Sequence, residues 1–243
     1  MGIKILLNQH PLNFKDDFMK ILVIADIHGY YERAFNKLSK IDTSRFDIMI
    51  CPGDFTDMFN QPPGFSQMDV VDILLQKLLS FNLPLYCVPG NHDPYEILEL
   101  LDEYGENLHN KVKIFKGMKF VGFGGAATPF NTIFEPTDEE IKQSLERMGK
   151  EVKNKNFVLV VHNPPKNTKV DIVAGGEHVG SQAIRDFITE KQPLLSISAH
   201  IHESSGIDKL GETTMFYPGP LYNGYYGVVE LKTERAKCEI KRI

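Results

Sequence analysis

The sequence predicts an α/β protein in which two mixed sheets pack face to face and helices cover the outer face of each sheet. Three observations predict this fold class. Short apolar runs typical of buried strands alternate with segments whose apolar residues recur with helical period. After residue 200, period-two alternation punctuated by Gly and Pro indicates antiparallel strands. A chain of 243 residues, 42% hydrophobic and 24% charged, is also long enough to bury a substantial core.

Apolar runs predict the strands, and helix-period patterns predict the helices between them. Strands are expected at 20–25, 47–51, 85–88, 119–123, 157–161 and 195–199, followed by 206–210, 213–217, 226–231 and 235–240. Helices are expected at 30–40, 68–80, 94–104, 137–150 and 181–190. The helix at 137 has the best-defined start, because Thr137 and Glu140 have the spacing of a capping box.

The first core strand begins near Met19, so residues 1–18 are expected to form an N-terminal extension. Within it, residues 3–7 could form an edge strand or contact a partner subunit. Residues 19–243 contain no internal repeat, low-complexity tract or linker-like segment, which predicts a single domain. A homodimer is a further expectation.

Composition excludes several classes of protein. A net charge of −5 provides no broad basic surface, which disfavours binding to extended nucleic acid. No apolar run approaches the roughly 20 residues of a membrane span, and the start lacks the pattern of a signal peptide. Cys51, Cys87 and Cys238 have no CxxC spacing and are expected to be free thiols. We therefore expect a cytoplasmic protein.

Polar clusters close five of the apolar runs. They contribute seven potential metal ligands, namely Asp26, His28, Asp54, Asn91, His162, His200 and His202. Side chains two apart on a strand point the same way, and the carboxyl ends of strands collect functional groups from distant segments. Each residue alone is more often a strand-end polar group or a satisfied core histidine. Together they predict a metal site, with mixed N and O ligands that suit Mn, Fe, Zn or Ni.

This ordered set of clusters resembles the calcineurin-like metallophosphoesterase superfamily over about residues 19–220, and most closely its microbial Icc-related predicted phosphoesterases. The resemblance implies a four-layer α/β/β/α sandwich. It also implies that Asp26, His28 and His202 bind one metal and that Asn91, His162 and His200 bind the other. Asp54 would bridge two divalent ions, with Mn favoured. Ala199 departs from the pattern, because Gly is commoner before the final His-x-His.

Two adjacent metals can ionise a bridging water, so that hydroxide attacks phosphorus and no protein nucleophile is needed. The leaving oxygen still needs a proton, and His92 follows the ligand Asn91 directly. We expect His92 to be the general acid and, by the resemblance, Asp57 to orient it and keep it protonated. Asp93 is the competing candidate for that role.

The expected substrate is a small phosphate diester or nucleotide. Met58 stands where related serine/threonine protein phosphatases have a phosphate-gripping arginine, which weakens the preference for a monoester dianion. Proximity to the clusters makes five residues candidate substrate contacts, namely Asn60, Asn91, Thr128, Asn131 and Asn163. The alternatives are a phosphomonoesterase or nucleotide pyrophosphatase with the same metals, a DNA nuclease, and a non-catalytic scaffold.

Overall fold

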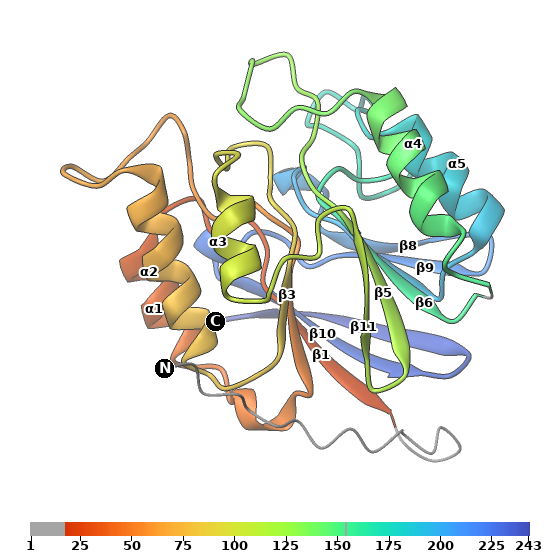
Figure 1. Cartoon of the computed structure of the whole chain (residues 1–243), viewed down its shortest axis with the longest axis horizontal. Helices are drawn as coiled ribbons and strands as arrows, with labels where there is room; N and C mark the ends of the chain where they lie inside the picture. Colours follow the sequence, from red (N-terminus) through yellow and green to blue (C-terminus); the bar gives the residue numbers. More distant parts are fainter. Residues whose placement is uncertain (1–17, 154) are drawn as a thin grey trace.

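Two mixed sheets form the centre of the protein in the computed structural model, which describes residues 18–153 and 155–243 (Figure 1). The five-stranded sheet has the order β11-β10-β1-β2-β3, and the six-stranded sheet has the order β4-β5-β6-β7-β9-β8. The strands of the first sheet are β1 (Met19–Val23), β2 (Ile48–Cys51), β3 (Leu85–Cys87), β10 (Tyr225–Lys232) and β11 (Arg235–Arg242). Those of the second are β4 (Lys111–Phe115), β5 (Met118–Phe123), β6 (Phe157–Val161), β7 (Leu195–Ile197), β8 (Gly206–Leu210) and β9 (Thr213–Tyr217).

Helices cover the outer face of each sheet (Figure 1). They are α1 (Tyr31–Leu38), α2 (Gln67–Leu79) and α3 (Ile97–Glu103) on the first sheet, and α4 (Asp138–Gly149) and α5 (Gln182–Lys191) on the second. Three short 3₁₀ helices are η1 (Thr43–Arg45), η2 (His202–Ser204) and η3 (Leu221–Asn223). The predicted α/β/β/α sandwich is therefore confirmed.

Both faces of the central strands are buried, which explains their continuous apolar runs. In β1, Leu22 packs towards the helices and Ile21 and Val23 pack between the sheets. In β6, Leu159 faces α4 and α5, whereas Val160 belongs to the core between the sheets. Side chains that alternate along each strand thus join the layers.

The parallel strands bring the predicted clusters to one edge of the molecule. Strands β1, β2 and β3 are parallel to one another, as are β5, β6 and β7. Each polar cluster follows the carboxyl end of β1, β2, β3, β6 or β7. This arrangement is the one that the sequence predicts.

The C-terminal strands and the capping box of α4 are confirmed. The Thr137 hydroxyl accepts from the amide of Glu140, and the Glu140 carboxylate accepts from the amide of Thr137. Strand β4 was not predicted. It is an edge strand that forms a hairpin with β5 through Lys116 and Gly117, and its Ile114 is 60% exposed, so an apolar run is missing there. The expectations for residues 1–17, including a strand at 3–7, lie outside the described residues.

Candidate metal centre

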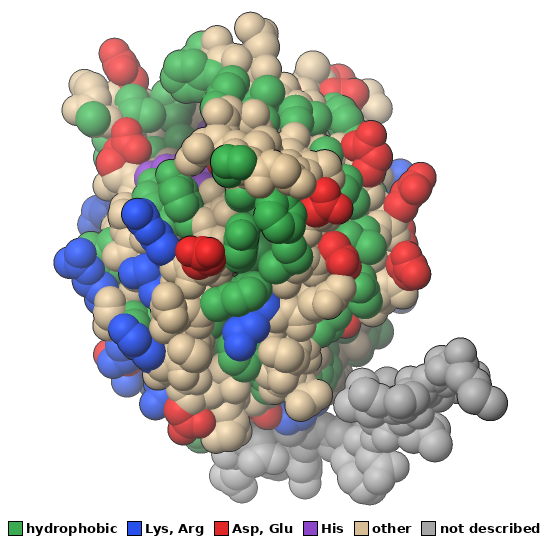
Figure 2. Space-filling model, turned by 90° about the vertical axis from the view of Figure 1, so that its left-hand side faces the viewer, with side chains coloured by type: hydrophobic (Ala, Val, Ile, Leu, Met, Phe, Trp, Pro, Cys, Tyr) green, Lys and Arg blue, Asp and Glu red, His purple; other side chains and the backbone are tan. Residues whose placement is uncertain are grey.

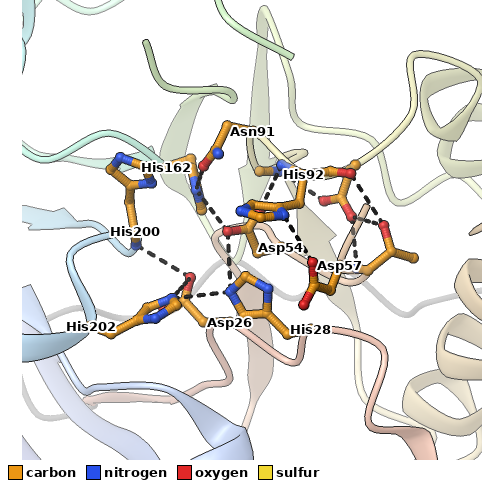
Figure 3. Close-up of polar contacts among 12 residues, drawn as sticks. Asp26, His28, Asp54, Asp57, Asn91, His92, His162, His200 and His202 are labelled. Carbon is orange, nitrogen blue, oxygen red and sulfur yellow. Dashed lines mark hydrogen bonds and ion pairs between the residues drawn. The ribbon is translucent and has the colours of Figure 1, made fainter. Parts of the chain in front are cut away.

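Side chains from five loops converge between the two sheets at their carboxyl edge (Figure 3). They form three overlapping groups of potential metal-binding donors, one of which consists of His28, Asp57 and His92. The other two share Asp54. Asp26, His28, Asp54 and His202 make one group, and Asp54, His162 and His200 make the other. Within each group, one donor atom per residue lies within 4.8 Å of the others. The carboxylate of Asp54 belongs to both groups.

Left-handed backbone, and not strand alternation, aims several of these side chains. Asp26, His28, Asp54 and His200 have φ values of 49°, 53°, 54° and 78°. Strands β1 and β7 both end three residues before the first ligand candidate that follows them. The side chains do converge as predicted, but the expected reason, alternation along a strand, is wrong. Non-glycine residues seldom adopt this conformation, and such strain is typical of functional sites.

Two glycines allow the loops after β2 and β3 to approach each other. Gly53 has a φ of +111°, and a Cβ on it would collide with the backbone of Gly90. A Cβ on Gly90 would overlap with the carboxylate of Asp54. Gly53 therefore permits a tight turn, whereas Gly90 is needed for space.

Asp54 lies at the centre of the site and is 1% exposed. Its Oδ2 atom is 3.4 Å from Nε2 of His28 and 3.3 Å from Nε2 of His162. Burial opposes its ionisation, but the charges of His162 and His28 hold the pKa of Asp54 well below its usual range. Burial likewise favours neutral His162, yet Asp54 raises the pKa of His162 to about 9. The buried carboxylate thus requires a positive neighbour.

The remaining donors complete two compact sets. Nε2 of His28 lies 3.0 Å from Nε2 of His202, which is itself 3.8 Å from Oδ1 of Asp26. Nε2 of His162 lies 2.9 Å from Oδ1 of Asn91. Ring nitrogens and carboxylate oxygens that face one another at these distances suit a shared divalent cation.

His162 is held in the orientation that metal binding requires. Its Nδ1 atom is 2.8 Å from the carbonyl oxygen of Pro52. Nδ1–H can donate to this carbonyl, so that Nε2 faces Asp54 and Asn91. A cation bound there would take the place of the Nε2 proton. The donor set and its supporting contacts therefore fit metal ions.

His92 lies beside the two groups and contacts Asp57. Their Nδ1 and Oδ1 atoms are 3.3 Å apart, and both side chains are partly exposed. The backbone amide of His92 donates to Oδ1 of Asp54 at 3.0 Å. Burial lowers the pKa of His92, but the contact with the Asp57 carboxylate and the charges of Asp54 and Asp57 outweigh it and raise the pKa overall. His92 is therefore suited to carry a proton.

The competing orienter, Asp93, has a different environment. It is fully buried, and its carboxylate accepts hydrogen bonds from the backbone amides of Gly90, Phe55 and Thr56 and from the Thr56 hydroxyl. It therefore joins the loops after β2 and β3 and makes no hydrogen bond or ion pair with the His92 ring among the described contacts. Asp57 is the carboxylate that faces this ring.

The five candidate substrate contacts have different surroundings in the structure. The Asn91 side-chain amide donates to the Thr132 hydroxyl at 3.0 Å. The Asn60 side-chain amide donates a hydrogen bond to the Tyr30 hydroxyl at 3.2 Å. Asn163 is 4% exposed, and its Oδ1 has no hydrogen-bond partner among the described residues.

The other two candidates belong to the loop after β5. The hydroxyl of Thr128 donates to Glu135 within this loop, and Asn131 is exposed. Neither has a contact with the two donor groups among those that the structure describes.

Several aromatic residues at the site escape prediction. The Tyr217 hydroxyl donates to Oδ2 of Asp26 at 2.6 Å, and the Tyr222 hydroxyl lies 2.9 Å from Nδ1 of His202. The ring of Phe59, 65% exposed, meets the His92 ring edge-on at 5.6 Å. No local pattern distinguishes these residues from core or surface aromatics.

Figure 2 shows histidine side chains, in purple, at the bottom of a hollow at the upper left of the face it presents.

Comparison with known proteins agrees with this geometry. Residues 19–204 match the family model described as calcineurin-like phosphoesterase. The chain belongs to this family. Calcineurin-like phosphoesterases are metal-dependent enzymes acting on phosphate esters, so the Asp and His groups are its candidate metal-binding cluster. The resemblance that the sequence suggests is confirmed.

Individual relatives extend over nearly the whole chain. The uncharacterized protein MJ1162 of Methanocaldococcus jannaschii is 37% identical over 208 residues, which are 84% of this chain and 89% of that protein. The structure of TT1561 of Thermus thermophilus has a TM-score of 0.69 at 20% identity, covering 93% of this chain and 99% of that one. A dimetal phosphatase from Danio rerio has a TM-score of 0.60 at 11% identity, covering 90% and 98%. These two structures share the fold.

None of the helices in the described part of the chain is long and apolar enough to span a membrane.

Proposed function

We propose that this protein is a binuclear metal-dependent phosphodiesterase that hydrolyses a small phosphate diester or nucleotide. The observation that carries the proposal is the position of Asp54, whose Oδ2 lies 3.4 Å and 3.3 Å from the Nε2 atoms of His28 and His162. One buried carboxylate therefore joins both donor groups, as a ligand shared by two cations must. The Danio rerio dimetal phosphatase has the same fold.

Each group provides the ligands for one divalent cation, with manganese favoured. Asp26, His28 and His202 would hold one ion, and Asn91, His162 and His200 the other, with Asp54 shared. When bound, such ions neutralise phosphoryl oxygens and lower the pKa of water. The chain itself contributes the orientation of these ligands and the proton donor.

His92 is the proposed proton donor to the leaving alkoxide. Its ring lies 5.0 Å from the His28 ring, so it stands at the edge of the proposed metal site. Asp57 fixes the Nδ1 side of the ring, which leaves Nε2 free to face the substrate. A proton held here neutralises the charge that develops on the leaving oxygen.

The charges around the site favour a diester over a monoester. The charges that act most strongly on Asp54, His92 and His162 come from other Asp and His side chains, and not from Lys or Arg. By the resemblance seen in the sequence, Met58 stands where related protein phosphatases have an arginine that grips a phosphate dianion. A diester carries one negative charge less and does not need that clamp. The exposed Phe59 ring beside His92 also offers apolar surface to a second ester group.

A substrate panel tests the proposal. The purified, metal-free protein is reconstituted with Mn²⁺, and kcat/KM is measured for bis(p-nitrophenyl) phosphate, p-nitrophenyl phosphate and 2′,3′- and 3′,5′-cyclic nucleotides. We expect turnover only with metal, loss of turnover in Asp54→Asn, and a higher kcat/KM for diesters. A preference for the monoester supports the phosphomonoesterase alternative. Salt-sensitive cleavage of DNA supports a nuclease, and no turnover with Mn²⁺, Fe²⁺, Zn²⁺ or Ni²⁺ supports a scaffold.

A further inference from the structure

Two tyrosines contact ligand candidates from behind. Tyr217 is the last residue of β9, is fully buried, and donates its hydroxyl hydrogen to Oδ2 of Asp26 at 2.6 Å. Oδ1 of Asp26 accepts the backbone amide of His200 at 3.2 Å. Both oxygens of the carboxylate are therefore engaged, and the carboxylate has one orientation.

Tyr222 makes the corresponding contact with His202. It lies on η3, and its hydroxyl is 2.9 Å from Nδ1 of the imidazole, while Nε2 of the same ring points at His28. Ligation through Nε2 requires the hydrogen to be on Nδ1, where the phenol oxygen of Tyr222 accepts it. The Tyr222 ring also packs edge-on against the His28 and His202 rings, with centroids 5.6 Å and 5.4 Å away.

His202 needs this support more than His28 or His162 does. Its side chain is 31% exposed, compared with 7% for His28 and none for His162. It begins η2 and so lies outside the strands of both sheets. Removing the Tyr222 hydroxyl leaves Nδ1 without a described protein partner and allows the imidazole to turn or to change its tautomer.

The segment that carries both tyrosines is itself tied to the first ligand loop. Pro220 forms a bridge with Ala25, and the amide of Leu221 donates to the Ala25 carbonyl at 2.8 Å. Ala25 directly precedes Asp26 in the chain. The match to the family model ends at residue 204, so both tyrosines lie beyond the matched part. Residues 217–222 form a support that the ligand clusters do not reveal.

We propose that Tyr217 and Tyr222 are positioning residues that hold Asp26 and His202 in their ligating orientations and so set the affinity of one of the two metal positions. The inference rests on the proposed function, because it concerns the same ligands. The other group is supported differently, by the Pro52 carbonyl behind His162 and by Thr132 behind Asn91. Loss of a tyrosine hydroxyl should therefore weaken the binding of one metal ion and leave the binding of the other unchanged.

Calorimetric titration of the metal-free, full-length protein with Mn²⁺ tests this inference. We expect two binding steps in the wild type. In Tyr222→Phe, one step should weaken by about 10-fold to 100-fold while the other is unchanged, as is usual when a hydrogen-bond partner of a metal ligand is removed. The matched control is Tyr225→Phe, in the same stretch of chain, whose ring instead lies against Arg242. It should leave both steps unchanged.

Tyr217→Phe should weaken the same step, but it also leaves a buried Asp26 oxygen without its donor and could destabilise the fold. Tyr222 is only half buried, so its variant keeps the test independent of folding. Nitrogen-15 NMR of the histidine rings gives a second readout, since the Nδ1–H signal of His202 should shift in Tyr222→Phe and not in the control.

The outcomes separate this inference from the proposed function. Two binding steps that are both unchanged in Tyr222→Phe, with an unchanged His202 signal, overturn the role of the tyrosine and leave the two-metal proposal standing. A wild type that binds a single ion overturns the two-metal proposal. The tyrosine's role then stands if Tyr222→Phe weakens that ion and falls if it does not.

Discussion

The Oδ1 atom of Asp57 lies 3.3 Å from Nδ1 of His92 and accepts the backbone amide of Phe59 at 2.9 Å. A single carboxylate thus orients the proposed acid and fixes the loop that carries the aromatic ring beside it. Asp57 therefore positions both the acid and the edge of the substrate site. Substitutions of Asp57 should change how the rate depends on the leaving group.

Asp57→Asn should slow substrates with poor leaving groups more than those with good ones. The neutral amide no longer favours the charged His92 imidazole, so a smaller fraction of His92 is protonated and able to donate to the departing oxygen. For aryl methyl phosphates, we expect kcat to fall about 10-fold to 100-fold with phenol as the leaving group and much less with p-nitrophenol. Asp102→Asn, a surface carboxylate paired with Lys111, is the control. Equal losses across the series would show that Asp57 does not act through His92.

Asp93→Ala should reduce stability. The buried carboxylate accepts three backbone amides and one hydroxyl, and its loss leaves these donors unsatisfied. We expect the free energy of unfolding of the metal-free protein to fall by about 3 kcal/mol or more in urea titrations. Asp102→Ala should change it by less than about 0.5 kcal/mol. A small effect of Asp93→Ala would mean that the loops after β2 and β3 do not depend on this carboxylate.

His109 should make the protein sensitive to acid. Burial lowers its pKa to about 4, and Nδ1 accepts the amide of Gly124 at 2.9 Å. Between about pH 6.5 and 4 the unfolded chain binds a proton at His109 that the folded state does not. The contribution of neutral, buried His109 to the free energy of unfolding is therefore complete above about pH 6.5 and is lost as the pH falls through about 4. The loss amounts to about 3 kcal/mol.

Urea titrations of the metal-free protein at pH 7, 5.5 and 4.5 measure this effect. Metal-free protein is used so that the release of metal does not contribute. His109→Gln should lose less stability between pH 7 and pH 4.5 than the wild type does. An equal decline in both proteins would show that His109 is not the group responsible.

The layered fold was predictable because both faces of the central strands are buried and the starts of α2, α4 and α5 carry a capping side chain. Continuous apolar runs such as those of β2 and β6 and the Thr137 capping box are visible in the sequence. Strand β4 was not predictable, since its residues are half-exposed and, among the strands that the structure describes, it pairs with β5 alone. An edge hairpin of this kind lacks the apolar pattern that identifies a core strand.

The candidate ligands were predictable as a set, although the reason for their convergence was not. The sequence shows Asp26 and His28 two residues apart, but the left-handed backbone that aims them depends on packing between loops. Tyr217 and Tyr222 were missed for the same reason. Their contacts with Asp26 and His202 join positions 191 and 20 residues apart, which no local pattern encodes.

The central claim is that Asp54 joins two metal positions. Asp54→Ala should lose high-affinity binding of both ions, because each loses a charged ligand. The most direct measurement is anomalous diffraction from crystals of the full-length protein grown with saturating Mn²⁺. The proposed function predicts two peaks per chain, one on each side of the Asp54 carboxylate. A single peak, or two peaks that do not share Asp54, would contradict it.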